Sequence, residues 1–228
     1  MKQFDNYKKI YRYIEHIDKS NPQYETHIII SHLYKYLEDY LNVITIQFKR
    51  IQQTKKEMEP LANQSIEKFN DRLLFTKLWT DIHFLLIAIE KSYNITIKLY
   101  NKLSMETKSK QIKSSDDYIA KKRLRNMLEH MDDNLTDGLN ESKRIIPNYS
   151  SHNINWFDNQ YGFISDNTLK LKKYKFKIEE TSLNLLYNYY DEITSILNKD
   201  YVLPVKKDAD AFWESFEKWR NNNQAQNQ

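Results

Sequence analysis

Seven apolar side chains between residues 30 and 51 recur in alternating steps of four and three, and this spacing constrains the fold more than any other feature. They are Ile30, Tyr34, Leu37, Leu41, Ile44, Phe48 and Ile51. Steps of four and three place side chains on one face of an α-helix. We therefore predict a long helix over about residues 24–58, ended by Pro60, whose single apolar stripe packs in a helical bundle.

A second long helix is predicted over about residues 65–103. Its apolar side chains are Phe69, Leu73, Leu78, Ile82, Leu85, Ile89 and Tyr93. Two long helices joined by a short connection lie antiparallel in helical bundles. The first half of the chain therefore predicts an antiparallel pair, each helix with one face turned to a common core.

The other predicted helices are shorter. We expect them over about residues 4–18, 116–137 and 179–198, with loops over 108–115 and 146–160. Ser115 stands where an N-cap is needed for the helix over 116–137.

Residues 161–178 alternate apolar and polar side chains with a period of two. This pattern predicts a β-hairpin, which must pack on the helices because two strands alone are marginally stable. The expected fold class is all-α: an antiparallel bundle with long helices and a small appended β-hairpin. We assign residues 1–200 to one helical domain and residues 201–228 to an aromatic segment and a disordered Asn/Gln-rich tail. The aromatic side chains of that segment are Phe212, Trp213, Phe216 and Trp219.

Composition excludes several classes of enzyme. The chain has two glycines, Gly138 and Gly162, and no cysteine. Glycine-rich phosphate loops need several positions without a Cβ close together, so P-loop, dinucleotide-binding and kinase chemistry are excluded. Without cysteine there is no thiol nucleophile, disulfide or cysteine-bound metal. The net charge of +4 permits nucleic-acid binding without arguing for it.

The chain carries no sign of a membrane or export segment. Its longest apolar run, residues 84–89, is too short to cross a bilayer. The first residues lack the apolar stretch of a signal peptide. We therefore expect a cytoplasmic protein with no membrane partner.

Three residues of the helix over 116–137 could carry chemistry: Arg125, Asn126 and His130 form the spacing Arg-Asn-x-x-x-His. Asn126 and His130 are four apart and share a helix face, and Arg125 lies about 100° round the helix from Asn126. All three flank the predicted apolar stripe, which consists of Leu124, Leu128, Met131 and Leu135. An arginine at this edge can bind phosphate through its planar fork, and a histidine near its free pKa can transfer protons at neutral pH.

This segment resembles the Arg-x(4–6)-His motif of the HEPN superfamily, in which a polar residue often follows the arginine, as Asn126 does here. The resemblance covers the motif and the helical layout around it. It implies a compact helical bundle and metal-independent cleavage of RNA, with no cofactor. In catalytic members two copies of the motif, usually from two subunits, form one composite site, so the resemblance also implies a homodimer.

The resemblance assigns roles to the motif residues. Arg125 would stabilise the phosphate and the charge of the transition state, His130 would transfer protons, and Asn126 would orient the histidine or the phosphate. Glu129 and Asp133 would act through these residues. The implied biology is a toxin–antitoxin or phage-defence ribonuclease of a bacterium, whose partners are the RNA substrate and an antitoxin or regulatory protein.

Other interpretations remain open. Arg125 could form a surface salt bridge with Glu129, four residues along the helix. Glu129, His130 and Asp133 could bind a divalent cation. The whole chain could instead be a non-catalytic interaction protein that binds a partner or RNA through its long helices and aromatic tail. A DNA- or RNA-binding regulator is a weaker option, because no strongly basic face is recognisable.

Further polar residues are expected to be structural. We predict that His27, His32 and His83 are structural histidines, with His83 the one that could face the motif. The alternating lysines of residues 170–177 are expected on a solvated outer face, with a phosphate-binding ribbon as the alternative.

Overall fold

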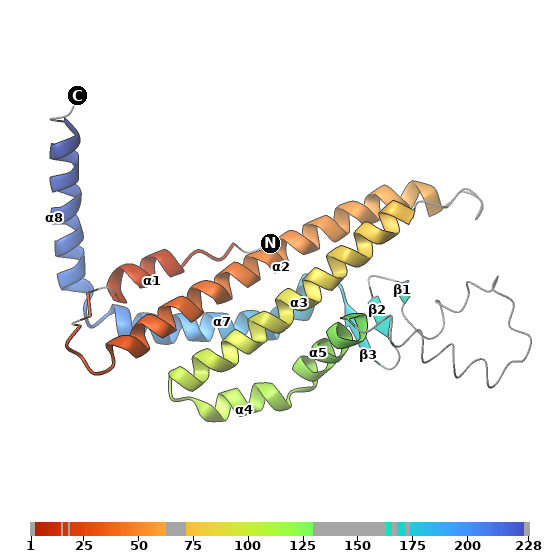
Figure 1. Ribbon diagram of the computed structural model, residues 1–228, viewed down its shortest axis with the longest axis horizontal. Helices are drawn as coiled ribbons and strands as arrows, with labels where there is room; N and C mark the ends of the chain where they lie inside the picture. The colour runs from red at the N-terminus through yellow and green to blue at the C-terminus, as the bar shows by residue number, and fades with distance from the viewer. Residues whose placement is uncertain are drawn as a thin grey trace, which may run out of the picture.

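The computed structural model describes residues 3–14, 16–17, 19–62, 72–129, 163–165, 168–171 and 174–225. The elements in chain order are α1 (Tyr7–Ile14), α2 (Tyr24–Ala62), α3 (Arg72–Lys102), α4 (Glu106–Ser114), α5 (Asp116–Glu129), β1 (Phe163–Ser165), β2 (Thr168–Leu171), β3 (Tyr174–Lys177), a 3₁₀ turn (Glu180–Leu183), α7 (Asn184–Leu197), a π-helical turn (Asn198–Val202) and α8 (Lys206–Ala225). Figure 1 shows α2 and α3 as the long central pair, with α1, α4, α5 and α7 beside them. The predicted all-α bundle with a small appended β-structure is confirmed.

The predicted apolar stripe of α2 forms the centre of the core. All seven of its members are buried, and so are the predicted members of α3 from Leu78 to Tyr93. Leu73 is the exception, since its side chain is 77% exposed near the start of α3. Within the described residues, no helix is both long enough and apolar enough to cross a membrane.

The boundaries of the two long helices differ from those predicted at one end. Helix α2 continues to Ala62, two residues beyond Pro60, which was expected to end it. Proline lacks one N–H donor, and the loss of a single hydrogen bond is tolerable in the last turn of a long helix whose stripe from Ile30 to Ile51 is buried. Residues 63–71, which include Phe69 and the predicted start of the second helix, lie outside the described residues.

Helix α1 is shorter than predicted because side chains of α2 fix the backbone before it. The Asn42 amide bridges the backbone of Phe4: its Oδ1 accepts from Phe4 N at 3.1 Å, and its Nδ2 donates to Phe4 O at 2.8 Å. The carboxylate of Glu38 accepts from the backbone N–H groups of Asn6 at 2.8 Å and Tyr7 at 2.9 Å. These two N–H groups begin the helix, so residues 4–6 are not part of it.

Residues 106–114 form helix α4, which corrects the prediction of a loop over 108–115. Most of its residues are polar, but two of its side chains, Ser109 and Ile112, are buried and pack against α3. Ser104 has φ 57°, the left-handed conformation that closes the C-terminus of α3 and reverses the chain into α4. Tertiary packing therefore stabilises a helix that no apolar periodicity predicts.

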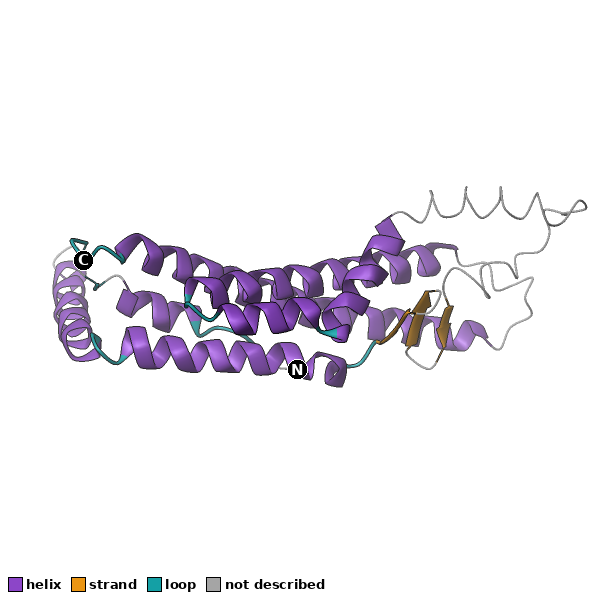
Figure 2. Cartoon of the chain, turned by 90° about the horizontal axis from the view of Figure 1, so that it is seen from below, coloured by secondary structure: helices purple, strands orange, loops and turns teal. Residues whose placement is uncertain are grey.

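The appended β-structure has three strands in the order β1-β2-β3, all antiparallel, where two strands were predicted. The expected second strand is divided into β2 and β3. Leu169, Phe176 and Ile178 are buried, while Lys175 and Lys177 are exposed. The apolar face packs against α5, as predicted for a sheet that needs helices to be stable. Figure 2 shows this sheet at one end of the bundle.

Helix α7 completes the core, and α8 leaves it. The Tyr34 hydroxyl lies 2.7 Å from Thr194 Oγ1, which joins α2 to α7. Helix α8 projects from the end of the bundle opposite the sheet (Figures 1 and 2). It is helical as far as Ala225, so most of the Asn/Gln-rich segment expected to be disordered is helical. Trp213 packs on Arg12 and donates from Nε1 to the Arg12 carbonyl at 3.3 Å, whereas Phe212, Phe216 and Trp219 are exposed.

Candidate functional site

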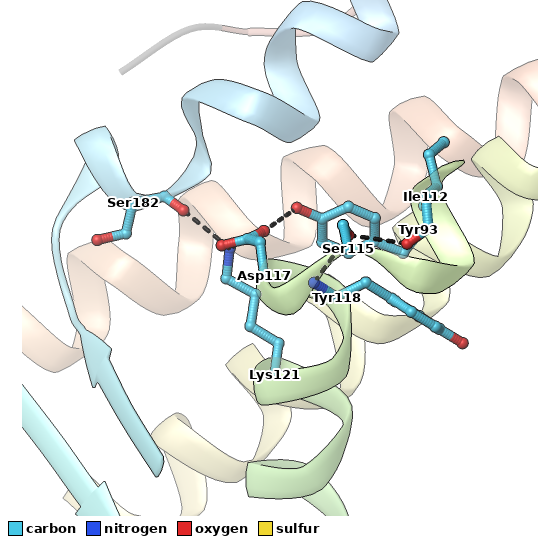
Figure 3. A network of polar contacts seen from close by, with 7 residues as sticks. All are labelled: Tyr93, Ile112, Ser115, Asp117, Tyr118, Lys121 and Ser182. Carbon is cyan, nitrogen blue, oxygen red and sulfur yellow. Dashed lines mark hydrogen bonds and ion pairs between the residues drawn. The ribbon is translucent and has the colours of Figure 1, made fainter. Parts of the chain in front are cut away.

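Helix α5, which carries the predicted motif, lies along the second half of α3. Its N-terminus is capped as predicted: Tyr118 N donates to Ser115 Oγ at 3.3 Å, and the Ser115 hydroxyl donates to Ile112 O at 2.8 Å (Figure 3). The Tyr118 hydroxyl donates to Asn94 Oδ1 of α3 at 3.0 Å. Leu124 is buried beneath the helix, which confirms the start of the predicted stripe.

A buried lysine joins α5 to two other elements (Figure 3). Lys121 Nζ donates to the two carboxylate oxygens of Asp117 at 2.7 and 2.6 Å, and to the Ser182 carbonyl at 2.9 Å. The Tyr93 hydroxyl of α3 donates to the same carboxylate. Burial lowers the pKa of Lys121, and the hydrogen bonds that it donates to Asp117 oppose this shift. The network fixes the rotation of α5 about its axis, and hence the direction in which Arg125 points.

Arg125 is held between two carboxylates. Its Nε donates to Glu90 of α3, and its Nη1 donates to Glu129 of α5. Glu90 is buried, while Glu129 is partly exposed. The salt bridge with Glu129 is the alternative that sequence spacing predicted. Glu90 stands 35 residues away in the sequence, so spacing could not identify it. Two acids around one guanidinium leave the immediate surroundings negative, and a phosphate group must compete with Glu129 for the arginine.

The structure places only part of the predicted motif. Asn126 is half-buried on α5, next to Arg125. His130 and Asp133 lie outside the described residues, and so do the cation-binding alternative that includes them and the Met131 and Leu135 part of the stripe.

His83 is the histidine that the structure places near Arg125. It is half-buried on α3, and its ring stacks on Phe84 with centroids 6.4 Å apart. Its Nε2 is buried and has no hydrogen-bond partner in the described part of the chain. Burial lowers the pKa of His83, and the nearby Arg125 charge lowers it further. The imidazole is therefore neutral at pH 7, and its Nε2 is a buried nitrogen that the described side chains leave unpaired.

A lysine-lined groove lies next to this site and was missed by sequence reasoning. It opens between α3, α4 and α5, with a volume of about 620 Å³. Its polar lining is Lys91, Asn94, Lys98, Asn101, Lys113, Tyr118 and Lys122. The signal in the sequence is a Lys-x-x-Asn-x-x-x-Lys-x-x-Asn pattern from residue 91 to 101, whose steps of three and four put all four side chains on one face of α3.

The other polar residues singled out from the sequence have structural surroundings. His27 is buried, and its ring meets the Tyr201 edge with centroids 4.9 Å apart; burial lowers its pKa. His32 is exposed. Lys177 Nζ lies 3.0 Å from Glu179 Oε2 on the outer side of the sheet. Within the described strands, this agrees with a solvated face.

Comparison with known proteins finds no relative. No protein-family model, no curated protein and no solved structure matches the chain. Function must therefore be argued from the residues along α3 and α5 themselves.

Proposed function

We propose that this protein is a metal-independent endoribonuclease whose site lies along the contact between α3 and α5 and is completed by a second copy of the chain. The observation that supports the proposal is the proximity of Arg125 to His83, a neutral histidine whose buried Nε2 has no hydrogen-bond partner in the described part of the chain. A guanidinium and a neutral imidazole suffice for phosphodiester transfer without a metal. The resemblance of Arg125-Asn126-x-x-x-His130 to the HEPN motif supports the same reaction.

The chemistry would proceed by internal transfer in the RNA. A histidine, His83 or His130, accepts the proton of a ribose 2′-OH, and O2′ attacks the adjacent phosphorus. Arg125 stabilises the negative charge on the phosphoryl oxygens. The P–O5′ bond breaks, and the 5′-oxygen takes a proton from a second histidine. The products are a 2′,3′-cyclic phosphate and a 5′-hydroxyl end. In a homodimer the second histidine would come from the facing copy of the motif.

Cleavage of single-stranded RNA in EDTA is the first test. We expect the wild-type protein to cut, and Arg125→Ala and His130→Ala each to lose at least about 100-fold in rate, the usual effect of removing such a group. His83→Ala is expected to lower the rate and to flatten its pH dependence near neutrality. His32→Ala and Arg220→Ala are the matched controls, because both side chains are exposed and far from α5.

Two outcomes would overturn this function. Equal cutting by the wild type, Arg125→Ala and His130→Ala would place the activity elsewhere or in a contaminant. Cutting of an RNA with 2′-deoxyribose at the cleavage position would exclude attack by O2′. Light scattering on the same samples tests the dimer, whose activity should fall when dilution separates the subunits.

Glu129→Gln is expected to lower KM for RNA about threefold. The carboxylate of Glu129 occupies Nη1 of Arg125, so its neutral amide analogue frees the guanidinium for phosphate. Stability should change by no more than about 0.5 kcal/mol, the value of an i,i+4 pair. Glu57→Gln, which breaks the exposed ion pair with Lys77, is the matched control and should leave KM unchanged. A higher KM in Glu129→Gln would mean that the carboxylate positions the arginine rather than competing for it.

Helix α8 favours a second candidate function, that of a non-catalytic interaction protein. Phe212, Phe216 and Trp219 form an exposed aromatic stripe on a helix that projects from the bundle. Aromatic patches of this kind are typical of protein interfaces. If wild-type protein cuts no RNA in the assay above, this function is favoured.

A further inference from the structure

The groove between α3, α4 and α5 has the composition of an anion site. Four of its lining residues are lysines from three helices: Lys91 and Lys98 from α3, Lys113 from α4 and Lys122 from α5. None of the described residues that line it is acidic. Its volume of about 620 Å³ falls in the range of about 300–1,000 Å³ that is usual for small-ligand sites.

Within the described part of the chain, the lysines of this groove are not paired with acids. Some lysines elsewhere on the described surface do form ion pairs, as Lys35 does with Asp39 at 2.8 Å and Lys77 with Glu57 at 2.9 Å. No ion pair to a described carboxylate forms at Lys91, Lys98, Lys113 or Lys122. Four like charges around one hollow repel one another, and a bound polyanion removes this repulsion.

The neutral groups of the groove also suit phosphate. Asn94 and Asn101 have amide N–H donors, and the Tyr118 hydroxyl, which donates to Asn94 Oδ1, fixes one of these amides in place. Ammonium and amide donors without a carboxylate bind phosphate oxygens, while a cation would find no anionic ligand there.

The groove leads to the motif. Lys122 and Asn126 are four residues apart on α5 and therefore lie one above the other on the same face. Lys91 of α3 follows Glu90, the residue that contacts Arg125. A chain of phosphates that lies in the groove would therefore reach Asn126 and Arg125 at its end.

We infer that this groove binds successive phosphate groups, either of a single-stranded RNA backbone or of a free oligophosphate. The inference rests on the proposed function only for naming RNA as the polymer. The lysines would hold the RNA through its backbone, without reading its sequence, and direct one phosphodiester to Arg125.

Binding of a 2′-O-methyl RNA of about 12 nucleotides, which cannot be cut by O2′ attack, tests the site by fluorescence anisotropy. We expect Lys91→Gln/Lys122→Gln to weaken binding about tenfold at low salt. The plot of log K against log salt concentration should become shallower by about 1.4, because each lost phosphate contact to a single strand removes about 0.7. The charge-matched control is Lys8→Gln/Lys9→Gln on the exposed side of α1, which should bind within about twofold of wild type.

Tripolyphosphate as a competitor separates the two sources of phosphate. If tripolyphosphate binds more tightly than the RNA, and the groove variant loses this binding, the site is one for free oligophosphates. If the RNA binds more tightly and the groove variant loses it, the site is one for a backbone. Equal binding by the groove variant and the control variant, or no binding of either probe to wild type, would overturn the inference.

The same samples separate this inference from the proposed function. Arg125→Ala should retain RNA binding within about threefold, since the lysines supply most of the contacts. A wild-type protein that binds RNA through these lysines but cuts none would refute the ribonuclease and leave the groove standing.

Discussion

Replacing Glu38 with alanine is expected to lower the free energy of unfolding by about 3 kcal/mol. The Glu38 side chain is buried, and each of its partners depends on it. It accepts the backbone N–H groups of Asn6 and Tyr7, which begin α1, and the Tyr190 hydroxyl at 2.6 Å. The carboxylate is thus both the N-terminal cap of α1 and the bridge between α2 and α7.

The size of the effect follows from the groups that lose a partner. An uncapped helix N-terminus costs about 1 kcal/mol, and a hydrogen bond to a charged group contributes about 1.5–3 kcal/mol. The Asn6 amide, which donates to the Tyr190 hydroxyl at 2.8 Å, keeps that hydroxyl partly satisfied and limits the loss.

Urea denaturation followed by circular dichroism measures this effect. Glu38→Gln keeps an amide oxygen that can accept two hydrogen bonds. Its free energy of unfolding should therefore fall less than that of Glu38→Ala. Asp39→Ala is the neighbouring control: its carboxylate is exposed and pairs with Lys35, so the loss should be below about 1 kcal/mol. Equal losses in Glu38→Ala and Asp39→Ala would contradict the assignment of Glu38 as the anchor of α1.

The contrast between Glu38 and Asp39 also shows which features of the fold could be predicted from the sequence. The stripe from Ile30 to Ile51 is local, because every member is placed by the helix that it belongs to, and all seven are buried as predicted. Glu38 lies next to that stripe in sequence. Nothing local distinguishes it from Asp39, because its partners are 32, 31 and 152 residues away.

The candidate site also has contacts that local spacing predicts and contacts that only the tertiary fold creates. The pairing of Arg125 with Glu129 follows from a spacing of four. Glu90 contacts Arg125, and His83 lies near it, only because α5 lies back along α3. Helix α4 was missed because a single buried isoleucine, Ile112, gives no periodic pattern in nine residues. The lysine groove has a readable pattern on α3, but its third and fourth lysines come from other helices.

Between pH 10 and pH 12 the protein is expected to lose stability steeply because of its buried tyrosines. Burial, helped by the hydrogen bond to Glu38, raises the pKa of Tyr190 to about 12. Burial also raises the pKa of Tyr187 to about 12. Burial raises the pKa of Tyr34, Tyr93 and Tyr100 as well, with hydrogen bonds to Asp117 and Glu192 adding to the effect at Tyr93 and Tyr100.

Stability falls with rising pH because the tyrosines ionise at a lower pH in the unfolded chain than in the folded protein. Below pH 10 these tyrosines are protonated in both states, so their contribution to stability is fully present. As the pH rises above 10, the unfolded chain loses protons that the folded protein retains, and unfolding becomes more favourable. Tyr190 alone should remove about 2 kcal/mol by pH 12, where the folded tyrosine is half ionised, since one pKa unit corresponds to about 1.4 kcal/mol. Lys121, whose pKa is lowered by burial, acts in the opposite direction, but it is a single residue against five.

Urea denaturation at several pH values from 9 upward, with tyrosinate absorbance as a second signal, measures this loss. Tyr100→Phe is the informative variant, because its partner Glu192 also contacts Lys108 and keeps one hydrogen bond when the phenol is removed. The variant should lose less stability than wild type between pH 10 and 12, by about 3 kcal/mol. Tyr36→Phe, an exposed position on α2, should follow the wild-type curve. If wild type and Tyr100→Phe decline in parallel, burial of this hydroxyl does not govern the alkaline transition.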